Sequence, residues 1–285
     1  MLQHDLVTEI GHPLHELDTP ALIIDTDILD LNINRIIENV SAAGSRLRPH
    51  IKTHRMLEVA HRQIAAGASG ICCAKTGEAE VFANGGIDDI FIANQVVGTR
   101  KIQRLQALAE RVRLAVGIDD RDHIHILDDA FQNGRSIDIN IEIDVGQART
   151  GVADSPSALA LARQILDTPG LKLRGIYTHE GHDYGATDQS DLLGIADRAQ
   201  IQMLSIAADI SNATNTDCEV SMGSTPSLLA RAFRPGIAEL RPGTAVFNDA
   251  SHANFLGHTD WLSLIHISEP TRPRLISYAV FCVKK

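Results

Sequence analysis

The chain has 285 residues, 44% of them hydrophobic and 22% charged, a composition typical of a globular protein. It carries 26 Lys and Arg against 36 Asp and Glu, so its formal net charge is -10. This acidic balance argues against nucleic acid or an anionic membrane as a partner, and no run of about 18 apolar residues predicts a membrane span. The four cysteines form no CxxC pair and no apolar leader is visible, so we expect a cytoplasmic protein without a disulfide framework.

From residue 21 onward, short apolar segments alternate with segments of helical spacing. Eight segments have the β-branched or continuous apolar character of buried parallel strands. They are residues 21–27, 46–53, 70–75, 89–94, 112–118, 137–146, 171–181 and 218–224. Each precedes a predicted helix, and several helices carry end signals, such as Gly67 after one helix and Ser155 as the N-cap of another.

Eight strand–helix units in succession predict an α/β protein with a (β/α)8 TIM barrel. The alternative is an open doubly wound sheet, which usually has a glycine-rich first turn, and no GxGxxG follows the first strand here. We therefore expect a barrel over residues 17–240. Residues 241–261 are then the start of a second unit.

The last segment, residues 262–285, differs in character from the rest. It has four Lys and Arg against one Glu, a net charge of +3, with no glycine and no coherent period. Its parts LSLIHISEPTR and ISYAVFC closely resemble the in-frame translation of a transposon-type sequencing adapter. We therefore expect a non-native tail in a chain whose natural form is longer; the alternative is a genuine short β-rich C-terminus.

The first candidate for chemistry is Lys52, in the segment RPHIKTH at 48–54. A lysine at the C-terminal end of a barrel strand points into the mouth, where barrel active sites are built. Partial burial there lowers the pKa of the amine and frees its lone pair, which suits covalent attachment of an aldehyde cofactor. An isolated lysine would more simply be solvated at the strand end, and the flanking pattern is what favours a functional role.

Two turns near the end of the barrel have the composition of an anion site. The segment GSTP at 223–226 places small residues before a helix, where backbone N–H groups and the helix dipole attract phosphate. The same residues also fit a plain N-cap followed by proline. In RPGT at 241–244, Gly243 would add a second backbone donor, although such a segment alone is typical of an ordinary turn.

Two loops contribute further candidates. IDVGQARTG at 143–151 places Arg149 between glycines, where it can reach a phenolate or a carboxylate, or form a structural pair with an aspartate. YTHEGHDYG at 177–185 offers tyrosines that can pack near a planar ring, and two histidines that can transfer protons. The His-x-x-His spacing also fits a metal if both side chains face one point. With 13 histidines in the chain, most must be structural or solvated.

Together these segments resemble the alanine-racemase-fold pyridoxal-phosphate enzymes, and most of all the D-threonine aldolase / D-serine dehydratase family. The resemblance rests on RPHIKTH, EIDVGQARTGV, YTHEGHDYG, GSTPS and ELRPGTAVFND, in this order within residues 17–261. It implies a barrel of the alanine racemase N-terminal type that binds pyridoxal 5'-phosphate, followed by the beginning of a C-terminal β domain.

The resemblance also implies residue roles. Lys52 matches the Schiff-base lysine, and Arg149 matches an arginine near the phenolic oxygen of the ring. The expected cofactor contacts, with Thr225 included as part of the GSTP turn, are Tyr177, Tyr184, Gly223, Ser224, Thr225, Gly243 and Thr244. His179 and His182 are candidates for catalytic assistance at the β-oxygen of a substrate. Family members carry a divalent metal, zinc or manganese, on a His-x-Cys or His-x-Asp pair in the C-terminal domain, and no such pair follows Trp261.

The expected function is therefore a lyase of small D-3-hydroxy amino acids, by aldol cleavage or by dehydration, with metal assistance and a homodimeric state in the full-length protein. Two alternatives stay open. An amino-acid racemase would need a second acid–base residue on the opposite face of the substrate. A non-catalytic carrier would bind the cofactor on Lys52 without turnover. A missing C-terminal domain would also impair the activity of this chain.

Overall fold

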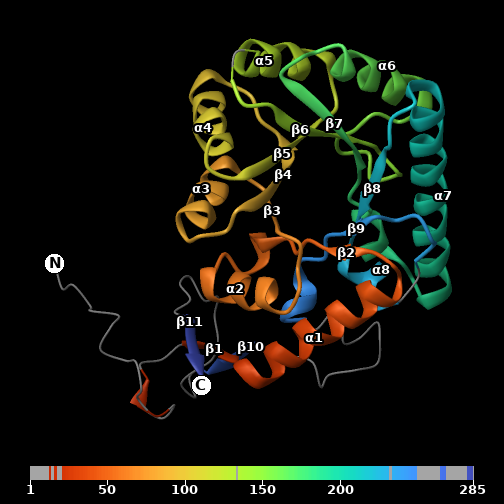
Figure 1. Cartoon of the computed structure of the whole chain (residues 1–285). Coiled ribbons are helices and arrows are strands. Elements are labelled where there is room, and N and C mark those ends of the chain that lie inside the picture. The colour runs from red at the N-terminus through yellow and green to blue at the C-terminus, as the bar shows by residue number, and fades with distance from the viewer. Residues whose placement is uncertain are drawn as a thin grey trace.

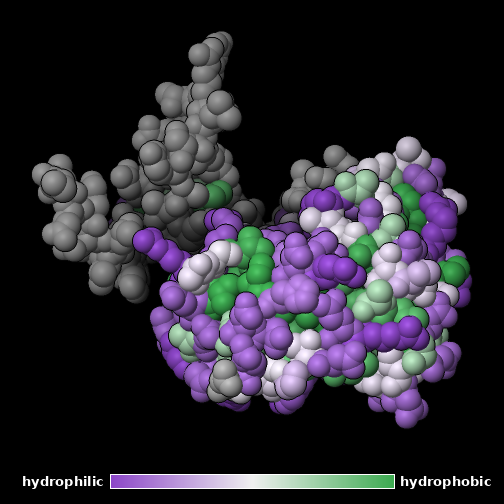
Figure 2. Space-filling model, turned by 90° about the horizontal axis from the view of Figure 1, so that it is seen from above, coloured by the Kyte–Doolittle hydropathy of each residue, from purple (hydrophilic) through white to green (hydrophobic). Residues whose placement is uncertain are grey.

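The protein is represented by a computed structural model that describes residues 13, 16–17, 21–132, 134–230 and 233–248, and the backbone of 264–267 and 281–284. Its main body is a ring of helices around an eight-stranded sheet (Figure 1). In Figure 2, the face in view is largely hydrophilic, with hydrophobic residues in separate patches. No helix of the described part is long and apolar enough to cross a membrane.

The eight strands of the main sheet are short and all neighbours pair in parallel. In chain order they are β2 (Arg46–Leu47), β3 (Ile71–Cys73), β4 (Asp89–Gln95), β5 (Arg113–Ile118), β6 (Ile137–Glu142), β7 (Leu171–Tyr177), β8 (Glu219–Met222) and β9 (Glu239–Leu240). In space the order is β2-β9-β8-β7-β6-β5-β4-β3. A parallel bridge between His50 and Cys72 joins the chain after β2 to β3. The bridge closes the sheet, and the predicted (β/α)8 barrel is confirmed.

Helices surround the barrel because each buries one apolar stripe against the strands. They are α1 (Thr26–Ala42), α2 (Leu57–Ala65), α3 (Thr76–Asn84), α4 (Thr99–Ala109), α5 (Arg121–Phe131), α6 (Ser155–Leu166), α7 (Gln189–Thr214) and α8 (Thr225–Leu229). Seven of them follow a barrel strand, whereas α1 precedes β2 and packs against both α2 and α8. The N-cap of α6 is Asp154, whose side chain accepts the Ser157 N–H at 2.8 Å, and not Ser155 as predicted. Three short 3-10 turns lie in the loops, η3 (Ile51–Thr53), η4 (Gly181–Gly185) and η5 (Thr244–Val246).

One expected barrel strand lies elsewhere. β1 (Ala21–Asp25) forms a separate sheet with β10 (Leu264–Ile267) and β11 (Phe281–Lys284), so the prediction of 21–27 as a barrel strand is wrong. Its place is taken by β9, which is too short for apolar periodicity to reveal. The predicted domain start at 241–261 is described only to residue 248, and of the predicted tail only the backbone of β10 and β11 is described.

A cluster of buried ion pairs lies inside the barrel near the N-terminal ends of the strands. The Nε of Arg48 donates to Glu239 at 2.7 Å, and one terminal nitrogen donates to Asp89 at 2.6 Å. Arg174 donates to the same Glu239 oxygen at 3.1 Å. Burial alone would raise the pKa of Glu239, but the charges of Arg48 and Arg174 lower it to about 2. This buried cluster occupies the end of the barrel where the strands begin, opposite the carboxyl ends of the strands.

Candidate active site

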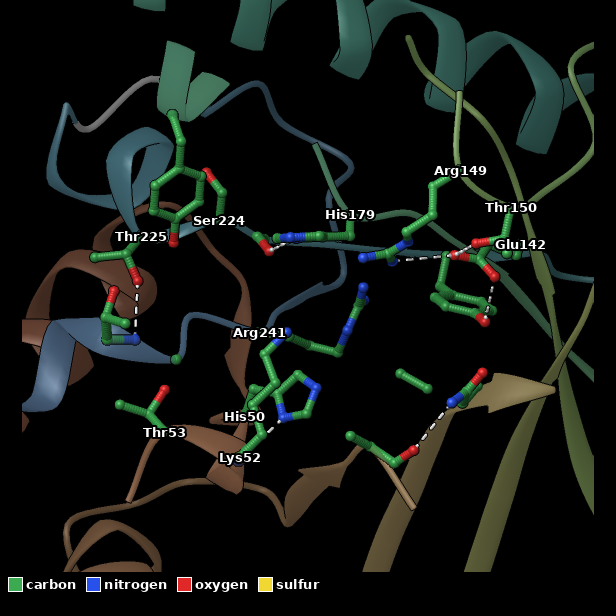
Figure 3. A pocket seen from close by; sticks show the side chains of 18 of the residues that line it. His50, Lys52, Thr53, Glu142, Arg149, Thr150, His179, Ser224, Thr225 and Arg241 are labelled. Carbon is green, nitrogen blue, oxygen red and sulfur yellow. Dashed lines mark hydrogen bonds and ion pairs between the residues drawn. The ribbon is translucent and has the colours of Figure 1, made fainter. Parts of the chain in front are cut away.

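A cavity of about 590 Å³ opens at the C-terminal ends of the strands, where barrel active sites form (Figure 3). Most of the residues predicted from the sequence line it. These are Lys52, Arg149, Tyr177, His179, Tyr184, Gly223, Ser224, Thr225, Gly243 and Thr244. They come from five separate segments of the chain, so the fold brings together what the sequence keeps apart.

Lys52 lies in η3, directly after β2, and its side chain reaches the cavity. Its backbone N–H donates to the ring Nδ1 of His50 at 3.4 Å, which fixes the turn that presents the amine. Burial, with the charges of Arg149 and Arg241, lowers the pKa of Lys52. A lower pKa increases the fraction of neutral amine, the form that reacts with a carbonyl.

The turns at 223–226 and 241–244 form one end of the cavity. The Thr244 N–H donates to the Thr225 hydroxyl oxygen at 3.2 Å, which ties the two turns together. Gly223 has φ +144°, and a Cβ there would lie 2.4 Å from the backbone nitrogen of Arg241. A Cβ on Gly243 would lie 2.9 Å from the Thr53 hydroxyl. Gly223 therefore needs to be glycine for the two backbones to approach this closely, and a side chain at position 243 would crowd Thr53.

Two buried acidic residues, Glu180 and Asp183, accept hydrogen bonds from the segment that begins at Gly223. The Gly223 N–H donates to buried Glu180 at 3.1 Å. The Ser224 hydroxyl donates to Asp183, which also accepts the Ser227 hydroxyl at 2.8 Å. Burial raises the pKa of both carboxyls, and that of Glu180 reaches about 7, with the charge of Asp183 contributing.

A carboxylate forms the centre of the opposite wall. Glu142, the last residue of β6, accepts from the Tyr177 hydroxyl at 2.9 Å, the Gln95 amide at 2.5 Å and the Thr150 hydroxyl at 2.9 Å. Arg149 approaches the same carboxylate at 3.8 Å. This wall of the cavity is thus organised around one acceptor.

Neutral histidines and a buried arginine complete the lining. Burial and the charge of Lys52 lower the pKa of His179 to about 4, and the same two causes lower that of His50. The Nδ1 of His179 lies 3.4 Å from the Gly223 carbonyl oxygen. The Arg241 guanidinium lies 5.4 Å from the centre of the Tyr177 ring, and donates to the Thr178 carbonyl at 2.5 Å.

The structure does not bring His182 to the cavity. A Cβ on Gly146 would lie 3.3 Å from the Nε2 of His182, so this ring faces the loop after β6. The turn η4 instead presents Tyr184 to the cavity. His179 and His182 therefore do not converge on one point. The described residues contain no group of three or more His, Cys, Asp or Glu side chains placed to hold a metal ion.

The kinship of the chain follows from comparison with known families. The sequence profile of the alanine racemase N-terminal domain matches residues 24–251, most of the chain. The chain belongs to this family. The resemblance inferred from the motifs is therefore confirmed.

Relatives in this family include named lyases. The D-threonine aldolase of Arthrobacter sp. is 33% identical over 255 residues, 88% of this chain and 65% of the relative. The D-threo-3-hydroxyaspartate dehydratase of Delftia sp. strain HT23 is 37% identical over 238 residues, 82% of this chain and 62% of the relative. The crystal structure of D-threonine aldolase from Filomicrobium marinum aligns with a TM-score of 0.82 at 34% identity, over 85% of this chain and 66% of that one. The chain thus matches less than two thirds of the length of these two curated relatives.

Sequence reasoning assigned no chemistry to several residues that line the cavity of this alanine-racemase-type barrel. They include His50, Gln95, Glu142 and Arg241. Gln95 and Glu142 are the last residues of β4 and β6, and a polar residue at the carboxyl end of a barrel strand is the available signal for a position at the barrel mouth. Arg241 begins the RPGT turn, in which the sequence pointed to Gly243 and Thr244 but not to the arginine.

Proposed function

We propose that this chain is the cofactor-binding barrel of a pyridoxal-phosphate-dependent lyase that acts on D-3-hydroxy amino acids. The observation that carries the proposal is that Lys52, with its lowered pKa, shares one cavity with the two glycine-containing turns at 223–226 and 241–244. An amine and an anion site in one cavity match the two ends of a phosphorylated aldehyde.

The residues present fit this cofactor. Gly223 and Gly243 leave a cradle that a Cβ would fill, and the hydroxyls of Thr225, Thr244 and Tyr184 border it. Lys52 would hold the aldehyde carbon, and Arg149 would face the ring oxygen. When bound, pyridoxal phosphate supplies an electron sink for a carbanion at Cα of an amino acid.

Residues of this chain would move the protons. The Nζ of Lys52 would take the Cα proton in dehydration, because its lowered pKa makes the neutral amine accessible. His179 is neutral above about pH 4, and a proton on Nδ1 next to the Gly223 carbonyl leaves Nε2 able to accept the proton of a β-hydroxyl. His182 faces away from the cavity, so His179 alone is retained as the candidate for this step.

The proposed substrate class comes from the relatives. D-Threonine and D-threo-3-hydroxyaspartate, after which these relatives are named, are both D-amino acids with a hydroxyl on the β-carbon. We also propose a homodimer and assistance by a divalent zinc or manganese ion. The described residues of this chain do not form a metal site, so no step above uses one.

Product analysis tests the function. The chain is incubated with pyridoxal phosphate and D-threonine, D-serine or D-3-hydroxyaspartate, and the products are identified. We expect glycine plus an aldehyde for aldol cleavage, or a keto acid plus ammonia for dehydration, and no product from Lys52→Ala. Interconversion of D- and L-alanine instead would support a racemase. Equal turnover by Lys52→Ala would contradict the assignment of the lysine.

A further inference from the structure

Glu142 is a buried carboxylate in the wall of the cavity, with only 4% of its surface exposed. Its Oε2 accepts from both the Tyr177 hydroxyl and the Gln95 amide, and its Oε1 accepts from the Thr150 hydroxyl. Three donors from β4, β7 and the loop after β6 therefore meet on one side chain. A buried charge with three charge-assisted hydrogen bonds is held in a single geometry.

An ionised carboxylate only accepts hydrogen bonds, so its partners must turn their protons toward it. The Tyr177 hydroxyl donates its proton to the hydrogen bond with Glu142, so toward any other neighbour its oxygen can only accept a hydrogen bond. The amide of Gln95 must present nitrogen to Glu142, and this leaves its carbonyl oxygen as an acceptor. Glu142 thus decides the hydrogen-bond direction of two neighbouring side chains that line the cavity.

The same carboxylate acts on Arg149. The guanidinium is half exposed and lies 3.8 Å from Oε1, its one ion-pair partner among the described residues. In Figure 3, Arg149 extends across the cavity from the side of Glu142 and Thr150, while Ser224 and Thr225 lie at the other end. An exposed arginine on a loop has many rotamers, and an opposite charge at its base restricts them.

We propose that Glu142 is a positioning residue of this site: it directs the Arg149 guanidinium over the cavity and makes Tyr177 and Gln95 acceptors, so that a bound ligand has one orientation. The inference deepens the proposed function and rests on it. A phosphate is repelled from the wall around Glu142 and accepted at the turns at 223–226 and 241–244, while a ring oxygen is met by Arg149.

The alternative is that Glu142 only stabilises the barrel, and a double-mutant cycle separates the two roles. The affinity for pyridoxal phosphate and the visible absorbance band of the bound cofactor are measured for wild type, Glu142→Gln, Tyr177→Phe and the double variant. We expect Glu142→Gln to weaken binding about tenfold and to shift the band, because an NH2 donor replaces one of the two acceptor oxygens and the negative charge is lost. When Glu142→Gln is already present, we expect Tyr177→Phe to change the affinity and the absorbance band little further.

A matched control is Glu219→Gln. Glu219 is also paired with arginines, Arg46 and Arg174, but it does not line the cavity. We expect the affinity of this variant for pyridoxal phosphate to stay within about twofold of wild type. We also expect its absorbance band to be unshifted. Wild-type affinity and an unshifted band in folded Glu142→Gln, or effects of Glu142→Gln and Tyr177→Phe that simply multiply, would overturn the inference.

Two further comparisons keep the test decisive. If Glu142→Gln does not fold, the same cycle is run with Tyr177→Phe and Gln95→Leu, because both partners donate to Oε2. Coupling between these two changes is expected, and independent effects would contradict the inference. If wild type itself shows no cofactor band, the proposed function fails, and that outcome is distinct from a normal band that Glu142→Gln leaves unchanged.

Discussion

Burial determines the charge of the histidines around Lys52. His50, His54 and His179 all have pKa values lowered by burial, and those of His54 and His179 fall to about 4. They are neutral at physiological pH, so the positive charge of the cavity comes from Lys52, Arg149 and Arg241. An amine next to two arginines and neutral imidazoles suits an anionic ligand better than a cationic one.

The lowered pKa of His54 predicts acid sensitivity. The unfolded chain takes up a proton on His54 near pH 6.5, but the folded chain does so only near pH 4. Between these values a fall in pH stabilises the unfolded state, so the free energy of unfolding decreases, by about 2 kcal/mol for this residue from pH 7 to pH 5. His54→Asn keeps an acceptor for the Met56 N–H and removes the titration.

Urea denaturation at pH 7 and pH 5 gives the comparison for His54. We expect the loss of stability between the two pH values to be smaller in His54→Asn than in wild type. Other buried groups contribute equally to both proteins, including Glu180, whose raised pKa acts in the opposite direction. The same pH dependence in both proteins would contradict the prediction.

Gly243 tests the anion site at a single position. Its Cβ would crowd the Thr53 hydroxyl at 2.9 Å and intrude on the cradle. We expect Gly243→Ala to weaken binding of pyridoxal phosphate about tenfold, and that of pyridoxal, which lacks the phosphate, by less than about twofold. Gly134→Ala is the matched control, since nothing lies within 4 Å of its added Cβ. Equal weakening for both ligands would place the phosphate elsewhere.

At the scale of elements, the strand count shows where sequence patterns lose their information. Continuous apolar runs identified the buried strands, because parallel strands are covered on both faces. The run at 21–25 has the same pattern but joins a different sheet, since apolar composition specifies burial and not the partner. β9 has two residues and begins with Glu239, so its place depends on long-range contacts with Arg48 and Arg174.

Part of the active site, like part of the fold, can be predicted from the sequence. The ends of strands and the glycine turns were predictable, because barrel geometry places them at one mouth. The direction of His182 was not predictable, because it depends on the 3-10 turn η4. The role proposed for Glu142 depends on three hydrogen-bond donors from separate segments of the chain. The local spacing of residues in the sequence cannot predict that these donors meet.

Glu239 tests how β9 is held in the barrel. Glu239→Ala would remove one of the two carboxylates that pair with buried Arg48, the one at 2.7 Å, and would leave only Asp89. It would also remove a carboxylate partner of Arg174. Removing one partner of a buried ion pair costs about 3–5 kcal/mol, whereas an exposed pair contributes about 1 kcal/mol or less. We expect a loss of this size in chemical denaturation, and a much smaller one for Glu80→Ala, which pairs with Arg104 at the surface. Similar losses in the two variants would contradict the prediction, because the buried pair would then contribute no more stability than the surface pair.

At the scale of the whole molecule, the net charge of the chain and the charge of the residues that line the cavity have opposite signs. The chain carries a net charge of -10, but among the described residues that line its cavity Lys52, Arg149 and Arg241 stand against one carboxylate, that of Glu142. A local positive site in an acidic protein attracts a small anion and not an extended polyanion. This distribution agrees with a phosphorylated cofactor and an amino-acid substrate.

The C-terminal segment is also a property of the whole chain. We propose that residues 262–285 are not native, on the basis of their resemblance to adapter sequence and their net charge of +3. In the part of the chain that the structure describes, β10 and β11 pair with the two edges of β1 and not with the barrel sheet. Sequencing of the gene from an independent sample is expected to give different codons after Trp261. The same uninterrupted codons would contradict the proposal.

The most direct test is where pyridoxal phosphate attaches. The chain is mixed with the cofactor, any lysine linkage is made permanent with borohydride, and the peptides are mapped by mass spectrometry. We predict one adduct, on the peptide that contains Lys52, and none in Lys52→Ala. An adduct on other lysines with Lys52 unmodified, or no adduct at all, would contradict the account.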